Sequence, residues 1–258
     1  MSDEDRIPTK LRTLLILEIL GKSDRPMTAT EINKDLGLPK QTVHRLCTTL
    51  EENGFLTRVG QSKRFYAARR LRTLGAGLLH NSRHYISRHQ ILLDVAEQVR
   101  ETVNFVVPED DGMSYLDRIE TDWAFRIQLP VGTHVPFHCT ASGKCFLASL
   151  AQKARTDLVR SLSLNPLTSK THTNPDTLLA ELQAVEENGY AIDDEEFMDG
   201  MVAIAVPVTD TLGRYVASLA FHGPTQRMSI ASAIERKDIL VHAAMRLQAV
   251  LFSDDEVD

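Results

Sequence analysis

The segment from Thr28 to Gly54 is the part of the sequence that most constrains the fold, because its signals predict two short helices joined by a tight turn. Thr28 is expected to cap the first helix, since Glu31 lies three residues later, at the spacing of a capping box. Gly37 should end that helix, because glycine adopts a positive φ without strain. Pro39 can then open the second helix, where its missing N–H does no harm. This pattern is typical of a helix-turn-helix.

The second helix of this pair is predicted to be amphipathic. Its apolar side chains recur at i, i+3, i+4 and i+7, namely at Val43, Leu46, Cys47 and Leu50. The opposite face carries hydrogen-bonding side chains of the kind that contact base edges and phosphates in a DNA groove. In the helix pair we therefore predict DNA contacts by Thr28, Lys40, Gln41, Thr42, His44, Arg45 and Thr48.

A β-hairpin is expected directly after the second helix. Two β-prone runs within residues 55–66 flank a turn at Gly60-Gln61-Ser62. A hairpin in this place is a wing, and we predict that Arg58, Lys63 and Arg64 contact phosphates from it. A leucine-rich first helix within residues 11–20 would complete the small core. The alternative is a generic three-helix segment whose polar faces are only solvated.

The charge distribution along the chain favours the DNA-binding interpretation. Residues 1–80 contain 14 Lys and Arg against 9 Asp and Glu, whereas residues 81–258 contain 15 against 26. Between Lys40 and Arg72 there are eight basic residues and two acidic ones. A basic head of this kind suits contact with phosphates. Charges that are merely solvated would not normally segregate by sign.

Length and composition place the chain in a broad class. The 258 residues leave room for two domains. We expect no transmembrane helix, because no run of 18 apolar residues occurs, and no signal peptide, because the chain starts Met-Ser-Asp-Glu-Asp. Three cysteines suit a reducing cytoplasm better than a disulfide framework. A cytoplasmic protein without membrane contact is therefore expected, with a frayed acidic tail from Ser253 onward.

The predicted domains are a winged helix-turn-helix at 1–68, a linker helix at 69–90 and a second domain at 91–258. In the linker region we expect a helix, a break near residues 80–85 and a further helix, which should join the domains and help the chain dimerise. The second domain is expected to have strands at 102–107, 112–119, 125–129, 202–208 and 215–222, a loop at 132–137, and helices at 140–150, 154–162, 174–188 and 230–251. This order predicts an α+β domain with an antiparallel sheet.

Neither a metal nor another cofactor is predicted. Two groups of possible metal ligands occur, His80 with His84, and His134 with His138, Cys139 and Cys145. The first pair has helical spacing but no third ligand nearby, and the second group has no helical support, so ordinary histidines are favoured in both. Gly143-Lys144 is not part of a phosphate-binding loop, because no glycine lies five residues before Gly143.

Motifs separated along the sequence carry a resemblance to a known family. Besides the winged helix-turn-helix at 8–66, they are Pro136–Lys144, Gly189–Phe197, Gly200–Val208, Asp210–Gly213 and Gly223-Pro224. In this order they resemble the IclR-type bacterial transcriptional regulators along nearly the whole chain. The resemblance implies a GAF-like effector-binding domain, dimers that often pair into tetramers, and repression or activation that responds to a small metabolite.

The resemblance also implies an effector site between two segments. One is the turn before the helix at 140–150, and the other is the acidic Asp-Asp-Glu-Glu run with the strand after it. Carried over by position, the effector-binding residues are Thr140, Ala141, Ser142, Gly143, Asp193 and Ala203. Some members have a cysteine in place of Ala203, which is consistent here with a different ligand or with one that packs against a methyl group.

The chemistry of this implied site suits a carboxylate. Small residues at the start of a helix let a ligand approach unpaired backbone N–H groups at the positive end of the helix dipole. Ser142 adds a hydroxyl, and Asp193 could accept a hydrogen bond from a ligand hydroxyl. The alternative is that Thr140 is only a cap, Gly143 only a packing residue, and the run from Asp193 to Glu196 a solvated loop.

The function predicted from these features is ligand-responsive control of transcription, and the target is expected to be a catabolic operon. The partners would be a palindromic or pseudo-palindromic double-stranded DNA operator, a small organic acid, and further copies of the chain in a dimer or tetramer. The alternative is an enzyme with a fused DNA-binding head, for example a hydrolase that uses Ser142 or Cys145. Ser142 lacks a nucleophile elbow, however, and no histidine is recognisably placed beside a buried acid.

Overall fold

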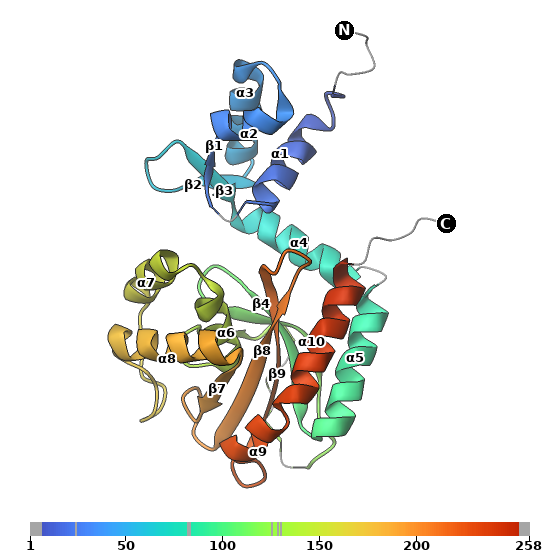
Figure 1. Cartoon of the computed structure of the whole chain (residues 1–258), viewed down its shortest axis with the longest axis vertical. Coiled ribbons are helices and arrows are strands. Elements are labelled where there is room, and N and C mark those ends of the chain that lie inside the picture. Colours follow the sequence, from blue (N-terminus) through green and yellow to red (C-terminus); the bar gives the residue numbers. More distant parts are fainter. Residues whose placement is uncertain are drawn as a thin grey trace. The chain divides into compact units, whose positions relative to one another are not determined.

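The computed structural model describes residues 7–23, 25–81, 84–124, 126–127, 129 and 131–252. The chain forms two compact units that divide between Leu78 and Leu79 (Figure 1). Helices α4 (Arg69–Asn81) and α5 (His84–Val99) occupy the segment where two helices are expected. The expected break between them falls at 82–83, which lies outside the described residues, as do the tail from Ser253 and the side chains of His80 and His84.

In the first unit, three helices pack with a small antiparallel sheet. The helices are α1 (Arg12–Gly21), α2 (Ala29–Leu36) and α3 (Lys40–Glu52), and the strands are β1 (Met27–Thr28), β2 (Leu56–Arg58) and β3 (Arg64–Ala67), in the order β1-β3-β2. Phe65 pairs with both Met27 and Arg58, and its buried ring joins Ile32 and Val43 in the core. The winged helix-turn-helix is therefore confirmed, and strand β1 adds to it.

The second unit contains a six-stranded antiparallel sheet in the order β6-β5-β4-β9-β8-β7. Its strands are β4 (Thr102–Pro108), β5 (Met113–Ile119), β6 (His134–Val135), β7 (Ala191–Asp194), β8 (Met201–Thr209) and β9 (Tyr215–Pro224). The expected hairpin of β8 and β9 is present, and Asp210 stabilises its turn by accepting hydrogen bonds from the N–H groups of Leu212 and Arg214, each at 2.9 Å. An antiparallel α+β domain is thus confirmed.

Helices cover both faces of this sheet (Figure 1). One face packs against α5, α9 (Ile230–Glu235) and α10 (Lys237–Phe252), and the other against α6 (Ala141–Ser149), α7 (Gln152–Ser161) and α8 (Pro175–Asn188). Successive side chains of strand β8 point to opposite faces of the sheet, so the strand packs against both layers of helices. Its Val202 and Ile204 join the α5 and α10 layer, whereas Ala203 and Ala205 join the α6 layer. The α6 layer therefore meets the sheet at small side chains.

Three expectations about elements are wrong. Residues 125–129 form no strand where they are described, because Ile127 offers its carbonyl to the Arg118 guanidinium at 2.8 Å instead of to a neighbouring strand. The expected loop at 132–137 contains β6, which takes the place beside β5. The closing helix is two helices that meet near Arg236, whose guanidinium donates to the carbonyl of Val99 at 2.9 Å. Among the described helices, none is both long and apolar enough to cross a membrane.

Candidate DNA-binding surface and effector site

The turn between α2 and α3 is fixed by hydrogen bonds on both sides. Thr28 and Glu31 form a complete capping box at the start of α2, with the Glu31 N–H donating to the Thr28 hydroxyl at 3.2 Å and the Thr28 N–H donating to the Glu31 carboxylate at 2.8 Å. Gly37 has a φ of 62° and ends the helix. Asn33 then bridges the turn through both the N–H and the carbonyl of Leu38. These contacts set the direction in which α3 leaves.

Helix α3 presents the polar face that its sequence predicts. Val43, Cys47 and Leu50 are buried, while Thr42 and Thr48 are half-buried at the edges of the exposed face. The exposed side chains on that face are Lys40, Gln41, His44, Arg45 and Thr49. Within the described part of the chain, no side-chain hydrogen bond or ion pair engages Lys40, Gln41, His44 or Arg45. Their donors and acceptors are therefore available to a partner.

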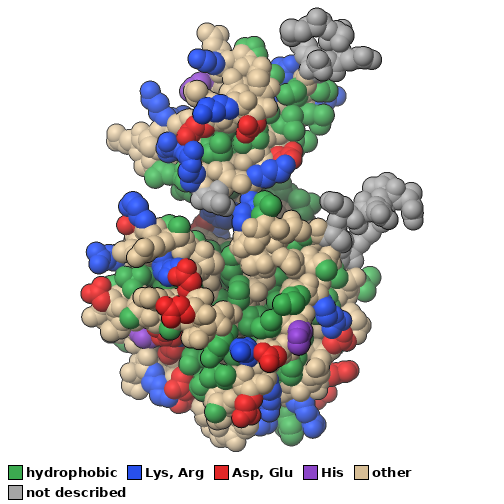
Figure 2. Space-filling view, in the orientation of Figure 1, with side chains coloured by type: hydrophobic (Ala, Val, Ile, Leu, Met, Phe, Trp, Pro, Cys, Tyr) green, Lys and Arg blue, Asp and Glu red, His purple; other side chains and the backbone are tan. Residues whose placement is uncertain are grey.

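The wing divides its three cations between two roles. Arg58 donates two hydrogen bonds to Glu51, at 2.9 and 3.1 Å, and stacks 4.7 Å from the ring centre of Phe65. Arg64 donates to Glu31 and to the carbonyl of Pro26, both at 2.9 Å. Lys63 is exposed and has no such contact with any residue that the structure describes. Figure 2 shows Lys and Arg side chains spread over the visible face of this unit.

Glu31 links the helix pair to the wing. Besides capping α2, its carboxylate pairs with Arg25 at 3.0 Å and with Arg64 at 2.9 Å. The hydrogen bond from the Thr28 N–H, followed by the one from Arg25, lowers the pKa of Glu31 to about 2. The hydroxyl of Thr28 is also engaged with Glu31, at 3.0 Å. Thr28, Arg58 and Arg64 thus all have partners inside the unit.

The start of α6 is built from a cap and a close backbone contact. The Thr140 hydroxyl donates to the carbonyl of Pro136 at 2.8 Å and accepts from the N–H of Gly143 at 3.2 Å. A Cβ on Gly143 would lie only 2.4 Å from the carbonyl oxygen of Phe137. Ala141 and Ser142 are buried. Thr140 and Gly143 therefore have the capping and packing roles that were considered as the alternative to ligand contact.

Asp193, Ala203 and His222 form one row across the sheet. Asp193 on β7 pairs with Ala203 on β8, and Ala203 pairs with His222 on β9, so the three side chains lie on the same face. That face carries α6, because Ala203 belongs to the same hydrophobic cluster as Ala141. The structure thus brings together two segments that the sequence places far apart, and it adds His222, which was not predicted.

Asp193 is fully buried, contrary to the idea of a solvated acidic loop. One carboxylate oxygen accepts hydrogen bonds from the N–H groups of Glu196, at 2.8 Å, and Phe197, at 3.2 Å. The other oxygen has no partner among the described residues. Burial, and then the charge of Glu196, raises the pKa of Asp193 to about 7. Asp193 therefore exists partly as a neutral acid near pH 7, able to donate as well as accept.

A chain of hydrogen bonds sets the protonation state of His222. Arg118 donates to the Asn104 side-chain oxygen at 3.0 Å, and the Asn104 amide nitrogen lies 3.0 Å from His222 Nδ1. With the amide oriented in this way, Nδ1 accepts and the proton of the ring is assigned to Nε2. Burial, followed by the charge of Arg118, lowers the pKa of His222 to about 3. His222 Nε2 is thus a buried donor without a hydrogen bond of good geometry in the described structure, although the backbone of Ile127 is close enough to the ring to act on its pKa in the opposite direction.

Asn104, Arg118 and His222 were missed because each lies within a strand that otherwise looks apolar or mixed. The only local signal was a polar residue in a buried run, as at Asn104 between Val103 and Phe105. Glu196, in the acidic run, is also buried, whereas Asp194 and Glu195 are half-buried and pair with Lys170 at 3.1 and 2.9 Å. The solvated-loop interpretation of this run is therefore wrong for its first and last members.

The two nucleophiles considered for an enzyme are poorly placed for catalysis. Burial raises the pKa of Cys145 to about 12, so its thiol is not activated. Cys145 also donates to the carbonyl of Ala205 at 3.3 Å. The carbonyl of Ser142 accepts from Ser218 at 3.2 Å, and no base is hydrogen-bonded to the buried Ser142 hydroxyl among the described residues. The geometry resembles a binding site more than a catalytic one.

The first unit is a winged helix-turn-helix, and the second is an α+β unit in which two buried polar atoms of one row lack hydrogen-bond partners among the described residues. This combination is typical of a DNA-binding transcriptional regulator. Residues 11–60 match the IclR helix-turn-helix domain, and residues 78–249 match the C-terminal domain of the bacterial transcriptional regulator IclR. The chain therefore belongs to the IclR family of bacterial transcriptional regulators. It is a regulator and not an enzyme.

Individual relatives agree with this assignment. The chain is 37% identical to the probable transcriptional regulator SauR of Cupriavidus necator, over 85% of this chain and 87% of that protein. The crystal structure of Thermotoga maritima IclR superposes with a TM-score of 0.63 at 27% identity, covering 94% of this chain and 98% of that one. The inducer-binding domain of a PobR double mutant from Acinetobacter, in complex with 3-hydroxybenzoic acid, gives a TM-score of 0.58 at 27% identity, covering 62% of this chain and 94% of that one.

Proposed function

We propose that this regulator controls a catabolic operon in response to a small organic acid, which binds at the start of α6 and along the row of Asp193, Ala203 and His222. The observation that carries this proposal is the pair of buried polar atoms in that row, Asp193 Oδ2 and His222 Nε2, that lack partners among the described residues. Buried polar groups in folded proteins nearly always have partners. A ligand that meets both atoms would remove the free-energy cost of their isolation.

The polarity of the row favours a carboxylate with a hydroxyl. The Nε2–H group of His222 is a donor backed by Asn104 and the Arg118 charge, which suits an anionic oxygen. Asp193 can accept from a ligand hydroxyl, or donate when it is protonated. The solved PobR domain holds 3-hydroxybenzoic acid, a molecule that carries both groups. Ala203 leaves a small side chain between the two polar atoms, where an apolar part of the ligand can lie.

Operator contacts are proposed for α3 and the wing. The residues are Lys40, Gln41, Thr42, His44, Arg45 and Thr48 on α3, with Lys63 on the wing. Thr28, Arg58 and Arg64 would contact phosphates only in addition to their partners inside the unit. One recognition helix reads only a few base pairs, so the operator would be palindromic or pseudo-palindromic and would bind a dimer.

The effector proposal is tested by a thermal-shift screen of the full chain against aliphatic and aromatic carboxylic and hydroxycarboxylic acids. A ligand present at 100 times its dissociation constant stabilises a protein by about 2.7 kcal/mol. The acid found should then bind more weakly to His222→Phe and not detectably to Ala141→Leu in calorimetry. His242→Phe is the matched control, because His242 is exposed on α10.

Operator affinity is measured on each variant as a check of folding. Retained operator affinity with lost acid binding supports the placement. If Ala141→Leu and His222→Phe bind the acid as tightly as the parent protein, the effector site is elsewhere. If no carboxylic acid stabilises the parent protein, the proposed class of effector is wrong.

A further inference from the structure

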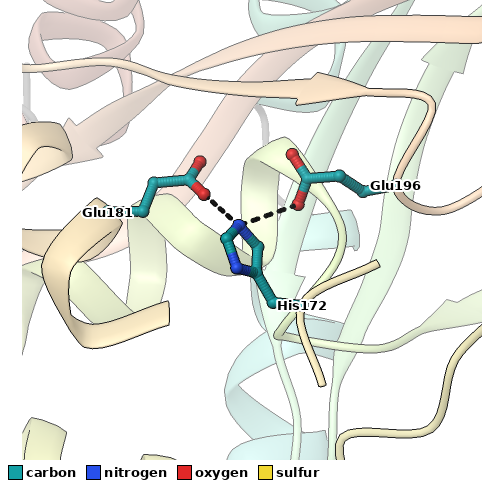
Figure 3. Close-up of side chains that lie close together, drawn as sticks. All are labelled: His172, Glu181 and Glu196. Atoms are coloured by element: carbon teal, nitrogen blue, oxygen red, sulfur yellow. Dashed lines mark hydrogen bonds and ion pairs between the residues drawn. The ribbon is translucent and has the colours of Figure 1, made fainter. Parts of the chain in front are cut away.

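We propose that His172, Glu181 and Glu196 form a binding site for a Zn²⁺ ion in the second unit. His172 comes from the segment that precedes α8, Glu181 from α8, and Glu196 from the segment between β7 and β8 (Figure 3). One donor atom from each residue lies within 4.8 Å of the others. They are the only such group of His, Cys, Asp and Glu found in the described part of the chain, so the set of His134, His138, Cys139 and Cys145 forms none.

In each of the two carboxylates one oxygen is bound by Lys144 and the other faces His172, to which Glu181 is hydrogen-bonded. The ammonium group of the buried Lys144 lies 2.5 Å from Oε1 of Glu181 and 2.5 Å from Oε1 of Glu196. The second oxygen of each carboxylate is directed toward His172 (Figure 3). Groups that hold the free ends of metal ligands in this way are a regular part of metal sites, because they fix the ligand orientation.

The imidazole of His172 is oriented in the same sense. Its Nδ1 lies 3.3 Å from the hydroxyl of Thr177, and that hydroxyl donates its own proton to the carbonyl of Asn174 at 2.9 Å. Thr177 therefore accepts from Nδ1–H, which leaves the lone pair of Nε2 in neutral His172 facing the carboxylates. A lone pair beside two anionic oxygens requires a cation between them, and the cation is either a proton on Nε2 or a metal ion.

An independent observation points to a ligand at this position. Oε2 of Glu196 lies 3.8 Å from His172 Nε2, and it has no hydrogen-bond partner among the described residues. The Glu196 side chain is only 8% exposed, so water does not readily compensate for the missing partner. An ion placed among the three donors would meet this oxygen directly. The side chains of His172 and Glu181 are 22% and 24% exposed, which leaves an entry path from solvent.

The donor set favours zinc over other common divalent ions. One imidazole nitrogen and two carboxylate oxygens are ligands that Zn²⁺ accepts with a fourth position left for water. Ca²⁺ and Mg²⁺ prefer shells made of oxygen with more ligands. Lys144 and the two carboxylates carry a net charge of about −1 when His172 is neutral. A divalent ion would therefore change the net charge of the cluster from about −1 to about +1.

One hydrogen bond connects this site to the row of Asp193, Ala203 and His222. The N–H of Glu196 donates to Asp193 Oδ1 at 2.8 Å, so an ion that fixes Glu196 also fixes the partner of Asp193. An influence of zinc on effector affinity rests on the proposed function. Zinc binding itself does not, and it is measured without any effector.

The test is calorimetric titration of Zn²⁺ into the full chain after treatment with a chelator. The expected result is about one Zn²⁺ per chain, with affinity reduced more than about tenfold in His172→Gln and in Glu181→Gln. The controls are His242→Gln on α10 and Glu187→Gln, an exposed glutamate on α8. Both controls should bind zinc as the parent does.

A second measurement keeps the proposal open to refutation if a variant unfolds. The parent protein is loaded with Co²⁺ in place of zinc, and its visible absorption spectrum should show a tetrahedral site with nitrogen and oxygen ligands and no thiolate charge-transfer band. A thiolate band would place the metal on a cysteine and overturn the assignment. The assignment also fails if the parent binds no zinc, or if both ligand variants bind it as tightly as the parent. In either case the cluster is a closed network of ion pairs around a protonated His172.

Discussion

Asp193 on β7 and His222 on β9 both pair with Ala203, which lies between them on β8, and each keeps one buried polar atom without a partner among the described residues. Two of the buried side-chain atoms that lack a hydrogen-bond partner among the described residues thus lie in one row of the sheet. The row faces α6, whose first turn consists of small side chains. This relationship is the basis for the effector proposal. It also means that the free energy of unfolding should depend on the protonation of Asp193, and therefore on pH.

Asp193→Asn should change the pH dependence of unfolding. The pKa of Asp193 is raised from 3.8 to about 7 in the folded state. Between these values the folded chain binds more protons than the unfolded chain, so this residue lowers the stability as pH rises and the loss is complete above about pH 7. The asparagine variant lacks this loss, which is on the order of a few kcal/mol at most.

The measurement is urea unfolding of the second unit at about pH 5 and about pH 8. Asp193→Asn should gain stability relative to the parent at the higher pH, whereas Asp157→Asn, at an exposed residue that pairs with Lys153, should behave alike at both. Equal effects of Asp193→Asn at the two values would show that Asp193 is ionised in the folded state throughout this range.

The sequence predicts those parts of the fold that depend on local signals. The capping box of Thr28 and Glu31 and the positive φ of Gly37 both depend on neighbouring residues, and both are confirmed. The buried stripe of α3 follows from helical periodicity in the same way. Each of these features is decided within about one or two helical turns, which a sequence window can contain.

The rest depends on strand register, which no local window contains. Asn104 meets His222 only because β4 and β9 pair, and the two residues are 118 positions apart. In the run from Asp193 to Glu196, alternation along β7 buries the first acid, and a turn with Glu195 at a φ of 62° brings the last one back inside. Composition alone would predict that all four acidic side chains are exposed. The effector row could therefore be inferred only in part.

Arg45→Ala should weaken specific operator binding by roughly 1–3 kcal/mol, as expected for the loss of a bidentate contact to a guanine. Arg45 is exposed on α3 and has no partner of its own among the described residues. Fluorescence anisotropy with operator and random DNA measures the effect, with Arg160→Ala on α7 as the control. A loss that is equal on both DNAs would assign Arg45 to a phosphate instead of a base.

Lys63 and Arg64 are adjacent on the wing but should behave differently. Lys63→Ala should reduce the magnitude of the slope of log K against log salt by about 1, without changing the unfolding of the first unit. Arg64→Ala should destabilise that unit, because Glu31 and the carbonyl of Pro26 lose a donor. Salt titrations of operator binding and thermal unfolding separate the two effects. An unchanged slope for Lys63→Ala would mean that the wing tip does not touch DNA.

Gly143→Ala should destabilise the second unit by about 1–3 kcal/mol or prevent its folding, because the added methyl group overlaps the backbone of Phe137. The matched control is Gly75→Ala in α4, where a Cβ meets nothing within 4 Å. That substitution should stabilise its helix by about 0.5–1 kcal/mol. Chemical unfolding followed by circular dichroism compares the two. A tolerated alanine at 143 would mean that the start of α6 can move away from Phe137.

Effector binding should weaken above about pH 7 if the carboxylate of the effector, and not its hydroxyl, contacts Asp193. Neutral Asp193 can donate a hydrogen bond to the bound acid, whereas ionised Asp193 repels it, and the pKa of about 7 places this change within reach of ordinary buffers. His222, with its pKa lowered to about 3, stays neutral over the same range and does not contribute. The affinity should therefore fall by up to about tenfold for each pH unit above 7, once Asp193 is mostly ionised.

In Asp193→Asn the affinity should be independent of pH over this range, because the amide donates at every pH. Calorimetry with one acid at several pH values measures both proteins, with ionisation of the buffer subtracted. A parent protein that binds the acid equally well on both sides of pH 7 would show that Asp193 does not contact the carboxylate.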